Sequence, residues 1–144
     1  MFDILIKYLR RIKIPFTVEA PNSVLYFNIN TPEGLWKCTV ILDHHTKGLG
    51  FYSTLPSTVP PNLRTRVALY LMALNNNRLF GNFELDLKTG DVHFKTYVDC
   101  ESVGLSERIL DRTMLVNITT MQQYLPKLMS LLKGTTQTQL KEAS

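Results

Sequence analysis

Two runs of alternating apolar and polar residues, separated by a short turn, constrain the fold of this chain most. The apolar positions are Phe83, Leu85 and Leu87 before the turn, and Val92, Phe94, Thr96 and Val98 after it. A period of two is typical of β-strands, whose side chains point alternately to opposite faces. Because apolar side chains must share one face, the sequence predicts an antiparallel hairpin in which Leu87 pairs with Val92 and Leu85 with Phe94.

The same register predicts the turn and the polar pairs of the hairpin. The loop would run over Lys88–Asp91, with Gly90 supplying the positive φ that tight hairpin turns need. Glu84 would then lie opposite Lys95 on the polar face. A slip of one residue would bring charged side chains into the core, so the choice of face is strongly specified.

Two helices are predicted before the hairpin. Apolar residues at helical spacing cover Ile4–Ile12, and Pro15 is expected to end this helix because proline disfavours the α conformation of the residue before it. A second apolar face runs over Leu63–Leu74 and starts after two consecutive prolines, which suit a helix start. Ala68 and Met72 widen that face, so we expect the second helix to be well buried.

A third helix is predicted from about Ser106 onward. Its apolar residues follow a 4-3-4-3-4 spacing, which is typical of a helix packed along one stripe; they are Met114, Ile118, Met121, Leu125, Leu128 and Leu132. Pro126 interrupts the pattern. Because proline removes a backbone hydrogen bond and clashes with the preceding turn, we expect a kink or a break near Gln122–Leu125.

Between the first two helices, short alternating segments predict three or four strands. The clearest places four residues on one face, namely Trp36, Cys38, Val40 and Leu42. The element order is therefore helix, three or four strands, helix, hairpin, helix, which predicts an α+β fold with an antiparallel sheet and helices packed mainly on one face. We expect residues 1–133 to form a single domain and the polar tail 134–144 to be disordered.

Composition excludes several classes of protein. With 144 residues, 44% hydrophobic and 19% charged, the chain is globular rather than disordered. It has no apolar run of the ~20 residues that cross a bilayer. The N-terminal segment, with Asp3 near its start and no small-residue cleavage site, does not resemble a signal peptide. Cys38 and Cys100 are far apart in sequence, which argues against a disulfide framework and predicts a cytoplasmic protein.

No catalytic or phosphate-binding motif is present, so we predict no enzyme and no cofactor. The best metal candidate is Asp43-His44-His45. Adjacent strand residues point to opposite faces, and a site would need His93 or further carboxylates from elsewhere, so a polar loop is the favoured interpretation. Cys100 lies between two acids, which would not activate a thiol, and it is expected to be a small core residue.

Two kinds of binding surface remain open. Lys7, Arg10, Arg11 and Lys13 form the tightest basic group in a chain of net charge +4. A solvated helix face is the favoured interpretation of that group, and weak nucleic-acid binding is the alternative.

Candidate partner-binding residues are Trp36, Tyr97 and Lys95. Lys95 and Tyr97 lie on the polar face of the hairpin, and aromatic residues concentrate at interface hot spots. Trp36 alternates with Cys38 and Val40, so a core position is the favoured interpretation for it.

Four stretches of the chain together resemble the YbjN family: Leu74-Asn75, Leu79–Asp86, Gly90–Phe94 and Tyr124–Leu128. Members of that family are described as bacterial sensory transduction regulators, and their fold is similar to that of the type III secretion chaperones. The resemblance covers residues 63–133 in pattern. It implies a chaperone-like fold, and the family offers no catalytic residues to carry over.

The expected function is a non-catalytic protein-binding module, either a regulator or a chaperone-like adaptor of the YbjN type. One alternative is a self-associating structural or stress protein, in which the apolar face of the second helix forms a homodimer. The other is the nucleic-acid binder described above, which the scattered charge disfavours. No membrane partner is expected.

Overall fold

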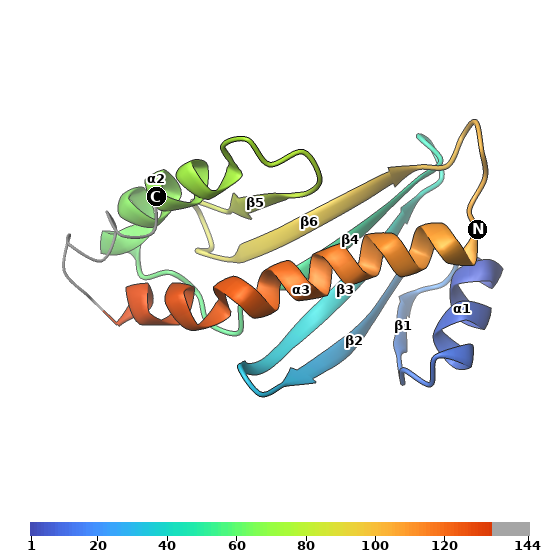
Figure 1. The fold of residues 1–144 in the computed structure, drawn as a ribbon, viewed down its shortest axis with the longest axis horizontal. Helices are drawn as coiled ribbons and strands as arrows, with labels where there is room; N and C mark the ends of the chain where they lie inside the picture. Colours follow the sequence, from blue (N-terminus) through green and yellow to red (C-terminus); the bar gives the residue numbers. More distant parts are fainter. Residues whose placement is uncertain (134–144) are drawn as a thin grey trace.

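A computed structural model describes residues 1–133 (Figure 1). The elements in chain order are α1 (Phe2–Arg11), β1 (Thr17–Ala20), β2 (Val24–Thr31), β3 (Gly34–Asp43), β4 (Gly48–Thr54), the 3-10 turn η1 (Pro61–Leu63), α2 (Arg64–Asn75), β5 (Asn82–Leu85), β6 (Val92–Asp99) and α3 (Glu107–Leu132). The predicted α+β class and element order are confirmed. The tail 134–144, expected to be disordered, lies outside the described residues.

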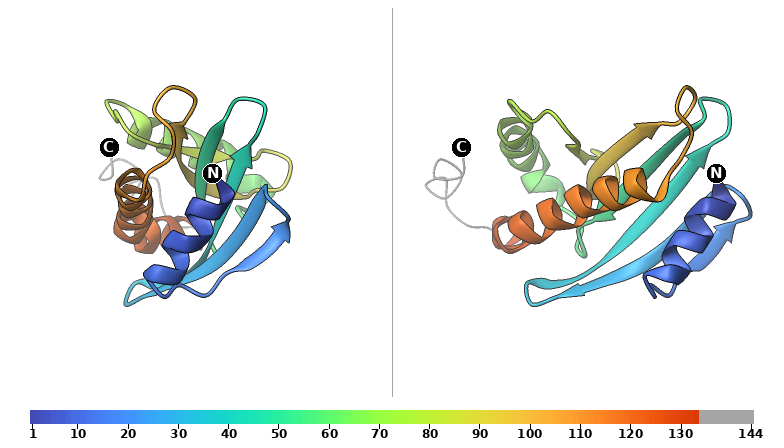
Figure 2. Two further views of the ribbon diagram at one scale, coloured as in Figure 1. Left: turned by 90° about the vertical axis from the view of Figure 1, so that its right-hand side faces the viewer. Right: turned by 45° about the vertical axis from the view of Figure 1, so that its right-hand side comes forward.

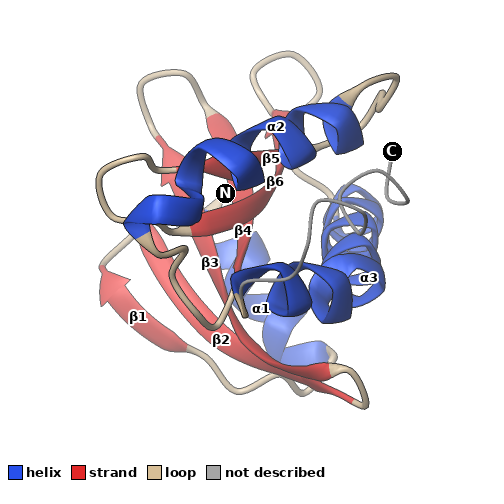
Figure 3. Ribbon diagram, turned by 90° about the vertical axis from the view of Figure 1, so that its left-hand side faces the viewer, coloured by secondary structure: helices blue, strands red, loops and turns tan. Residues whose placement is uncertain are grey.

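The six strands form one sheet in the order β1-β2-β3-β4-β6-β5, and every neighbouring pair is antiparallel. β6 pairs with β4, so the connection through α2 returns the chain to the far edge, where β5 closes the sheet. Both edge strands are short, which limits unwanted pairing with other chains. Figure 2 shows α1 and α3 on the same side of the sheet, and Figure 3 shows α2 over its β5–β6 end.

The buried side chains of all three helices meet the same face of the sheet. Beneath α1 and the first half of α3 lies a cluster that includes Leu5, Leu9, Leu25, Phe27, Val40, Phe51 and Leu110. Beneath α2 and the second half of α3 lies another, which includes Trp36, Val67, Leu71, Phe83, Phe94, Met121 and Leu125. The prediction of helices on one face is therefore confirmed, and the opposite face is left open.

A buried polar group joins α3 to the centre of the sheet. The Asn117 side-chain amide donates to the backbone carbonyls of Phe51 on β4 (3.0 Å) and Phe94 on β6 (2.9 Å). The Ser53 hydroxyl donates to the Asn117 Oδ1 atom (2.6 Å), and the Trp36 Nε1 atom donates to Ser53 (2.9 Å). Asn117 is fully buried, and these bonds supply the partners that a buried carboxamide requires.

Two helices differ from expectation. Pro15 was expected to end the first helix, but α1 ends four residues earlier, at Arg11. Lys13 adopts a left-handed φ of 58°, and the Ile14 amide donates to the Leu9 carbonyl (3.0 Å), which is the geometry of a Schellman cap. Pro126 does not break α3, which continues to Leu132.

The expectation that α2 is well buried was wrong. Val67, Leu71 and Leu74 are buried, but Leu69 is 62% exposed and Met72 is 69% exposed. The physical reason is the position of α2 over one end of the sheet, where the helix packs against β5 and the described residues leave Leu69 and Met72 uncovered. The apolar surface of α2 is therefore larger than the part of it that the core buries.

The predicted hairpin faces are correct, but the register was wrong by two residues. Leu85, not Leu87, pairs with Val92, and Phe83 pairs with Phe94. Leu87 lies in the loop and is 63% exposed. A two-residue shift keeps every side chain on its predicted face, so alternation alone cannot detect it.

Asp86 explains why the strand stops early. Its carboxylate accepts hydrogen bonds from the amides of Lys88 (2.8 Å) and Thr89 (3.2 Å), and its own carbonyl accepts from the Gly90 amide (2.8 Å). This turn closes the chain directly after Leu85. Gly90 has a φ of 82°, as predicted for the turn.

Replacing Asn117 with Leu should destabilise the fold by about 2–4 kcal/mol, because the Ser53 hydroxyl and two strand carbonyls would lose their buried partner. The midpoint of urea unfolding measures the loss. Gln123→Leu makes a comparable amide-to-leucine change at an exposed position of the same helix and serves as the control. Equal midpoints for the two variants would contradict this role for Asn117.

Asp86→Asn should weaken the acid dependence of stability. The hydrogen bonds from Lys88 and Thr89 lower the pKa of Asp86 below its ordinary value of 3.8. The carboxylate therefore stabilises the fold above pH 3.8, and this contribution is lost as the pH falls through the lowered pKa. Asparagine keeps an acceptor oxygen but cannot titrate.

Urea unfolding measured at neutral and acidic pH tests this expectation. The wild type should lose more stability on acidification than Asp86→Asn. Asp3→Asn removes the same charge on α1 and is measured as the control for the loss of one negative charge. A wild-type slope in Asp86→Asn would show that the carboxylate contributes no acid-sensitive stability.

Candidate functional site on the open face of the sheet

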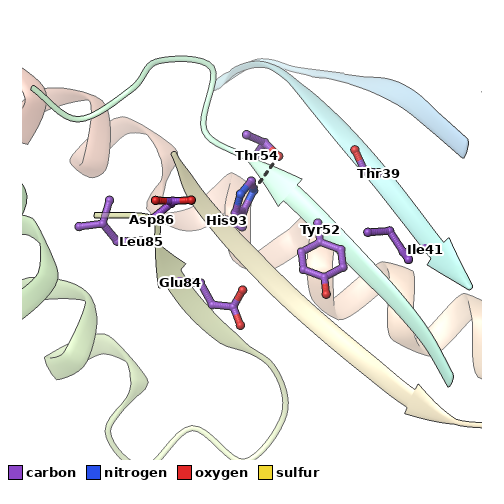
Figure 4. A pocket seen from close by; sticks show the side chains of 8 residues that line it. All are labelled: Thr39, Ile41, Tyr52, Thr54, Glu84, Leu85, Asp86 and His93. Atoms are coloured by element: carbon purple, nitrogen blue, oxygen red, sulfur yellow. Dashed lines mark hydrogen bonds between the residues drawn. The ribbon is translucent and has the colours of Figure 1, made fainter. Parts of the chain in front are cut away.

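The sheet face opposite the helices carries a hollow of about 580 Å³. It spans four strands and is lined by Thr39, Ile41, Tyr52, Thr54, Glu84, Leu85, Asp86 and His93 (Figure 4). Most of these residues occupy the outward-facing positions that alternate with core residues along β3, β4, β5 and β6. The site is therefore built by strand alternation, and the loop after β5 adds Asp86 to it.

His93 is held in the middle of this hollow. Its Nδ1 atom lies 2.9 Å from the Thr54 Oγ1 atom, in a hydrogen bond whose direction depends on the tautomer. The Tyr52 ring stands edge-on to the imidazole, with 6.1 Å between ring centroids. These contacts from β4 orient the ring, and Figure 4 shows Glu84 and Asp86 on the other side of it.

An ion pair borders the hollow. The Lys95 ammonium donates to the Glu84 carboxylate, and this bond raises the pKa of Lys95. Glu84 lies directly opposite His93 and diagonally across from Lys95. The expected contact between Glu84 and Lys95 therefore forms, although the two residues are not directly paired.

Two tyrosine rings lie against glycines of β4. A Cβ atom on Gly48 would lie 1.9 Å from the Tyr97 hydroxyl, and one on Gly50 would lie 2.8 Å from the Tyr52 ring. Side chains at these positions would displace the rings, so glycine allows them to lie close to the sheet. Tyr97 is still 46% exposed and presents an aromatic surface to solvent.

The candidate metal ligands do not come together. His44 contacts the Asn22 carbonyl (2.5 Å), whereas His93 contacts Thr54 in the hollow. Asp43 accepts hydrogen bonds from the His45 amide (2.9 Å) and the Thr46 hydroxyl (2.7 Å), which makes it a turn residue. Within residues 1–133, no group of three or more histidine, cysteine or acidic side chains could hold a metal ion.

The three predicted partner-binding residues lie in two different places. Lys95 and Tyr97 are on the open face beside the hollow. Trp36 is in the core, only 1% exposed, with its indole bonded to Ser53. The core interpretation of Trp36 is the correct one, and its side chain has no surface to offer a partner.

The cysteines and the basic group of α1 also take structural positions. Cys38 and Cys100 are buried free thiols, and burial raises the pKa of Cys38 to about 12.

Arg11 pairs with Glu107 of α3 (2.9 Å) and stacks over Tyr8. Tyr8 in turn donates to Asp111 of α3 (2.6 Å). One of the four basic residues therefore fastens α1 to α3.

The contribution of β3 and β4 to the site was not predicted from the sequence. Thr39, Tyr52 and Thr54 alternate with buried residues, so their outward direction could have been predicted. That β4 lies beside β6 could not, because the intervening segment with α2 and β5 separates the two strands by nearly 40 residues.

Comparison with solved structures identifies proteins of the same fold. The crystal structure of YbjN from E. coli matches with a TM-score of 0.72 at 14% identity, covering 90% of this chain and 92% of that one. The HopA1–SchA chaperone–effector complex matches with a TM-score of 0.61 at 16% identity, covering 88% of this chain and 92% of that one. The ExsC–ExsE complex matches with a TM-score of 0.61 at 15% identity, covering 85% and 89%.

No curated protein matches the chain, and no helix within residues 1–133 is long and apolar enough to span a membrane. The YbjN family model, described as "Putative bacterial sensory transduction regulator", matches residues 2–129. That match covers all ten elements except the last residues of α3, in agreement with the similar fold of the E. coli protein. The chain belongs to the YbjN family.

Proposed function

We propose that this protein is a non-catalytic protein-binding module, a regulator or chaperone-like adaptor that holds a segment of a partner protein on the open face of its sheet. The observation that carries the proposal is the uncovered face itself, since all three helices pack on the opposite side. Membership of a regulator family and a fold similar to that of a chaperone bound to its effector support the same role.

The chemistry of the open face suits a peptide segment. Tyr97 and Ile41 present partly exposed apolar surface, and aromatic side chains of this kind supply much of the binding energy at protein interfaces. Around them, Glu84, His93 and Lys95 offer charged and hydrogen-bonding groups that fix register and orientation. The short edge strands leave the face of the sheet, rather than its edges, as the larger surface.

The cytoplasm is the proposed location of this activity. Cys38 and Cys100 are both free and buried, a state that suits a reducing compartment. Burial raises the pKa of both thiols, so they stay protonated and unreactive. This fits a role in binding rather than in redox chemistry.

Tyr97→Ala should weaken capture of the partner about tenfold, or ~1.4 kcal/mol, because it removes an exposed aromatic contact from the proposed surface. The wild type and the variant would be used as bait in the native host, with quantitative mass spectrometry of the proteins recovered. Leu115→Ala removes an apolar side chain of 63% exposure from α3, away from the sheet, and serves as the control.

The expected result is a reproducible set of proteins that the wild type and Leu115→Ala recover and Tyr97→Ala does not. Thermal denaturation of each bait checks that loss of binding is not loss of folding. Failure to recover any reproducible protein, or equal recovery by all three baits, would count against the open face as the binding surface.

A second candidate function is self-association through α2. Leu69 and Met72 are exposed on this helix, and Leu87 is exposed on the neighbouring loop. Met72 and Leu87 line a hollow of about 260 Å³ between α2 and β5. Clustered apolar groups of this kind are typical of protein interfaces.

Met72→Lys should convert a dimer to a monomer if α2 forms the interface, because a charge would enter an apolar contact. Sedimentation velocity over a range of concentrations measures the change. Leu115→Lys introduces the same charge at a similarly exposed position on α3 and should leave the mass unchanged. A strictly monomeric wild type at high concentration would exclude this function.

A further inference from the structure

The side chain of Arg78 lies in an unusual environment in the loop between α2 and β5. Its guanidinium carbon lies 5.8 Å from the ring centroid of Phe83, 5.4 Å from that of Phe94 and 5.6 Å from that of Tyr124. These distances are typical of cation–π contacts, which hold the cation without using its N–H groups as hydrogen-bond donors. The charge is thus held in position by contacts with rings rather than by hydrogen bonds.

The hydrogen-bonding groups of this region are unmatched. The Arg78 Nε atom is buried and has no hydrogen-bond partner, and the guanidinium forms no ion pair with any residue of the described part of the chain. The Tyr70 hydroxyl of α2 is likewise buried without a partner. These two are the only buried side-chain polar atoms without a partner in residues 1–133, and Tyr124 is a neighbour of both residues.

A hollow of about 460 Å³ opens beside Arg78. It is lined by Leu74, Asn76, Asn77, Arg78, Leu79, Phe80 and Tyr124. Asn76 and Asn77 are exposed, and their side-chain amides form no hydrogen bond with the described residues. The hollow therefore combines one fixed cation with two free amide groups, on the helix side of the molecule and away from the open face.

An unmatched buried donor is costly, so an acceptor that reaches this cation removes an existing penalty. The planar guanidinium matches a carboxylate, whose two oxygens accept two parallel N–H groups. A single cation neutralises a singly charged anion and leaves a phosphate dianion half neutralised. The partial negative charge at the end of α2 lowers the affinity further for more highly charged ligands.

We propose that the hollow around Arg78 is a binding site for a carboxylate group, with the guanidinium as the anion-binding donor and the Asn76 and Asn77 amides at its rim. Phe83, Phe94 and Tyr124 act as positioning residues that hold the guanidinium. The site is separate from the open face and does not depend on the function proposed for that face.

Titration of the full chain with sodium acetate, followed by NMR of the Arg78 Nε–H signal, tests the site directly. At constant ionic strength maintained with chloride, acetate should shift this signal saturably and raise the melting temperature. Arg78→Lys keeps the charge but lacks the planar fork, and it should lose most of the acetate-induced rise in melting temperature. Arg66→Lys makes the same change at an exposed position of α2 and should bind like the wild type.

Two further probes separate possible sources of the carboxylate. A capped Gly-Glu-Gly peptide that binds more tightly than acetate, with no binding of its Gly-Gln-Gly counterpart, would support the site and indicate a protein segment as the ligand. Equal binding of acetate and the Glu peptide would support the site and indicate a small carboxylate. A linear, unsaturated response to acetate, a response equal to that of chloride, or unchanged acetate binding by Arg78→Lys would overturn the proposal.

Discussion

The buried carboxamide of Asn117 is the interaction on which the arrangement of this fold depends. It joins α3 to two adjacent strands that are distant in sequence, since the Phe51 carbonyl belongs to β4 and the Phe94 carbonyl to β6. Apolar packing would let a helix slide along the sheet at little cost, whereas a buried amide has one position in which its donors and acceptor are all matched. Asn117 therefore fixes where α3 crosses the sheet, and with it the boundary between the two apolar clusters.

The open face follows from that placement. With α3 fixed across β3, β4 and β6, the other helices pack on either side of it against the same sheet face. The opposite face keeps polar and aromatic residues that a covering helix would have buried at a cost. The proposed binding surface is thus a consequence of the way the core is assembled, and its hydrogen-bonded His93 and paired Glu84 and Lys95 give it a defined chemical character.

The sequence predicted the helices, the strands and the buried face of each hairpin strand well. It predicted the strand pairing and the extent of helix burial poorly. Alternation placed Cys38, Val40 and Phe94 in the core, and the structure agrees. The hairpin pairing was off by two residues because Asp86 turns the chain through local hydrogen bonds that apolar alternation does not record. For α2, helical periodicity predicted an apolar face, but how much of it is covered depends on where the helix lies relative to the sheet.

The sequence by itself determined the α+β class, the order of elements and the inward or outward direction of the residues along β3, β5 and β6, because these depend on local periodicity. Only the tertiary structure decided that β6 lies beside β4, that Asn117 bridges them, that Trp36 is unavailable to a partner and that Arg78 lies against three aromatic rings. Those features depend on contacts between residues far apart in the chain. No local pattern encodes them, because strand order and helix placement minimise the free energy of the whole assembled core.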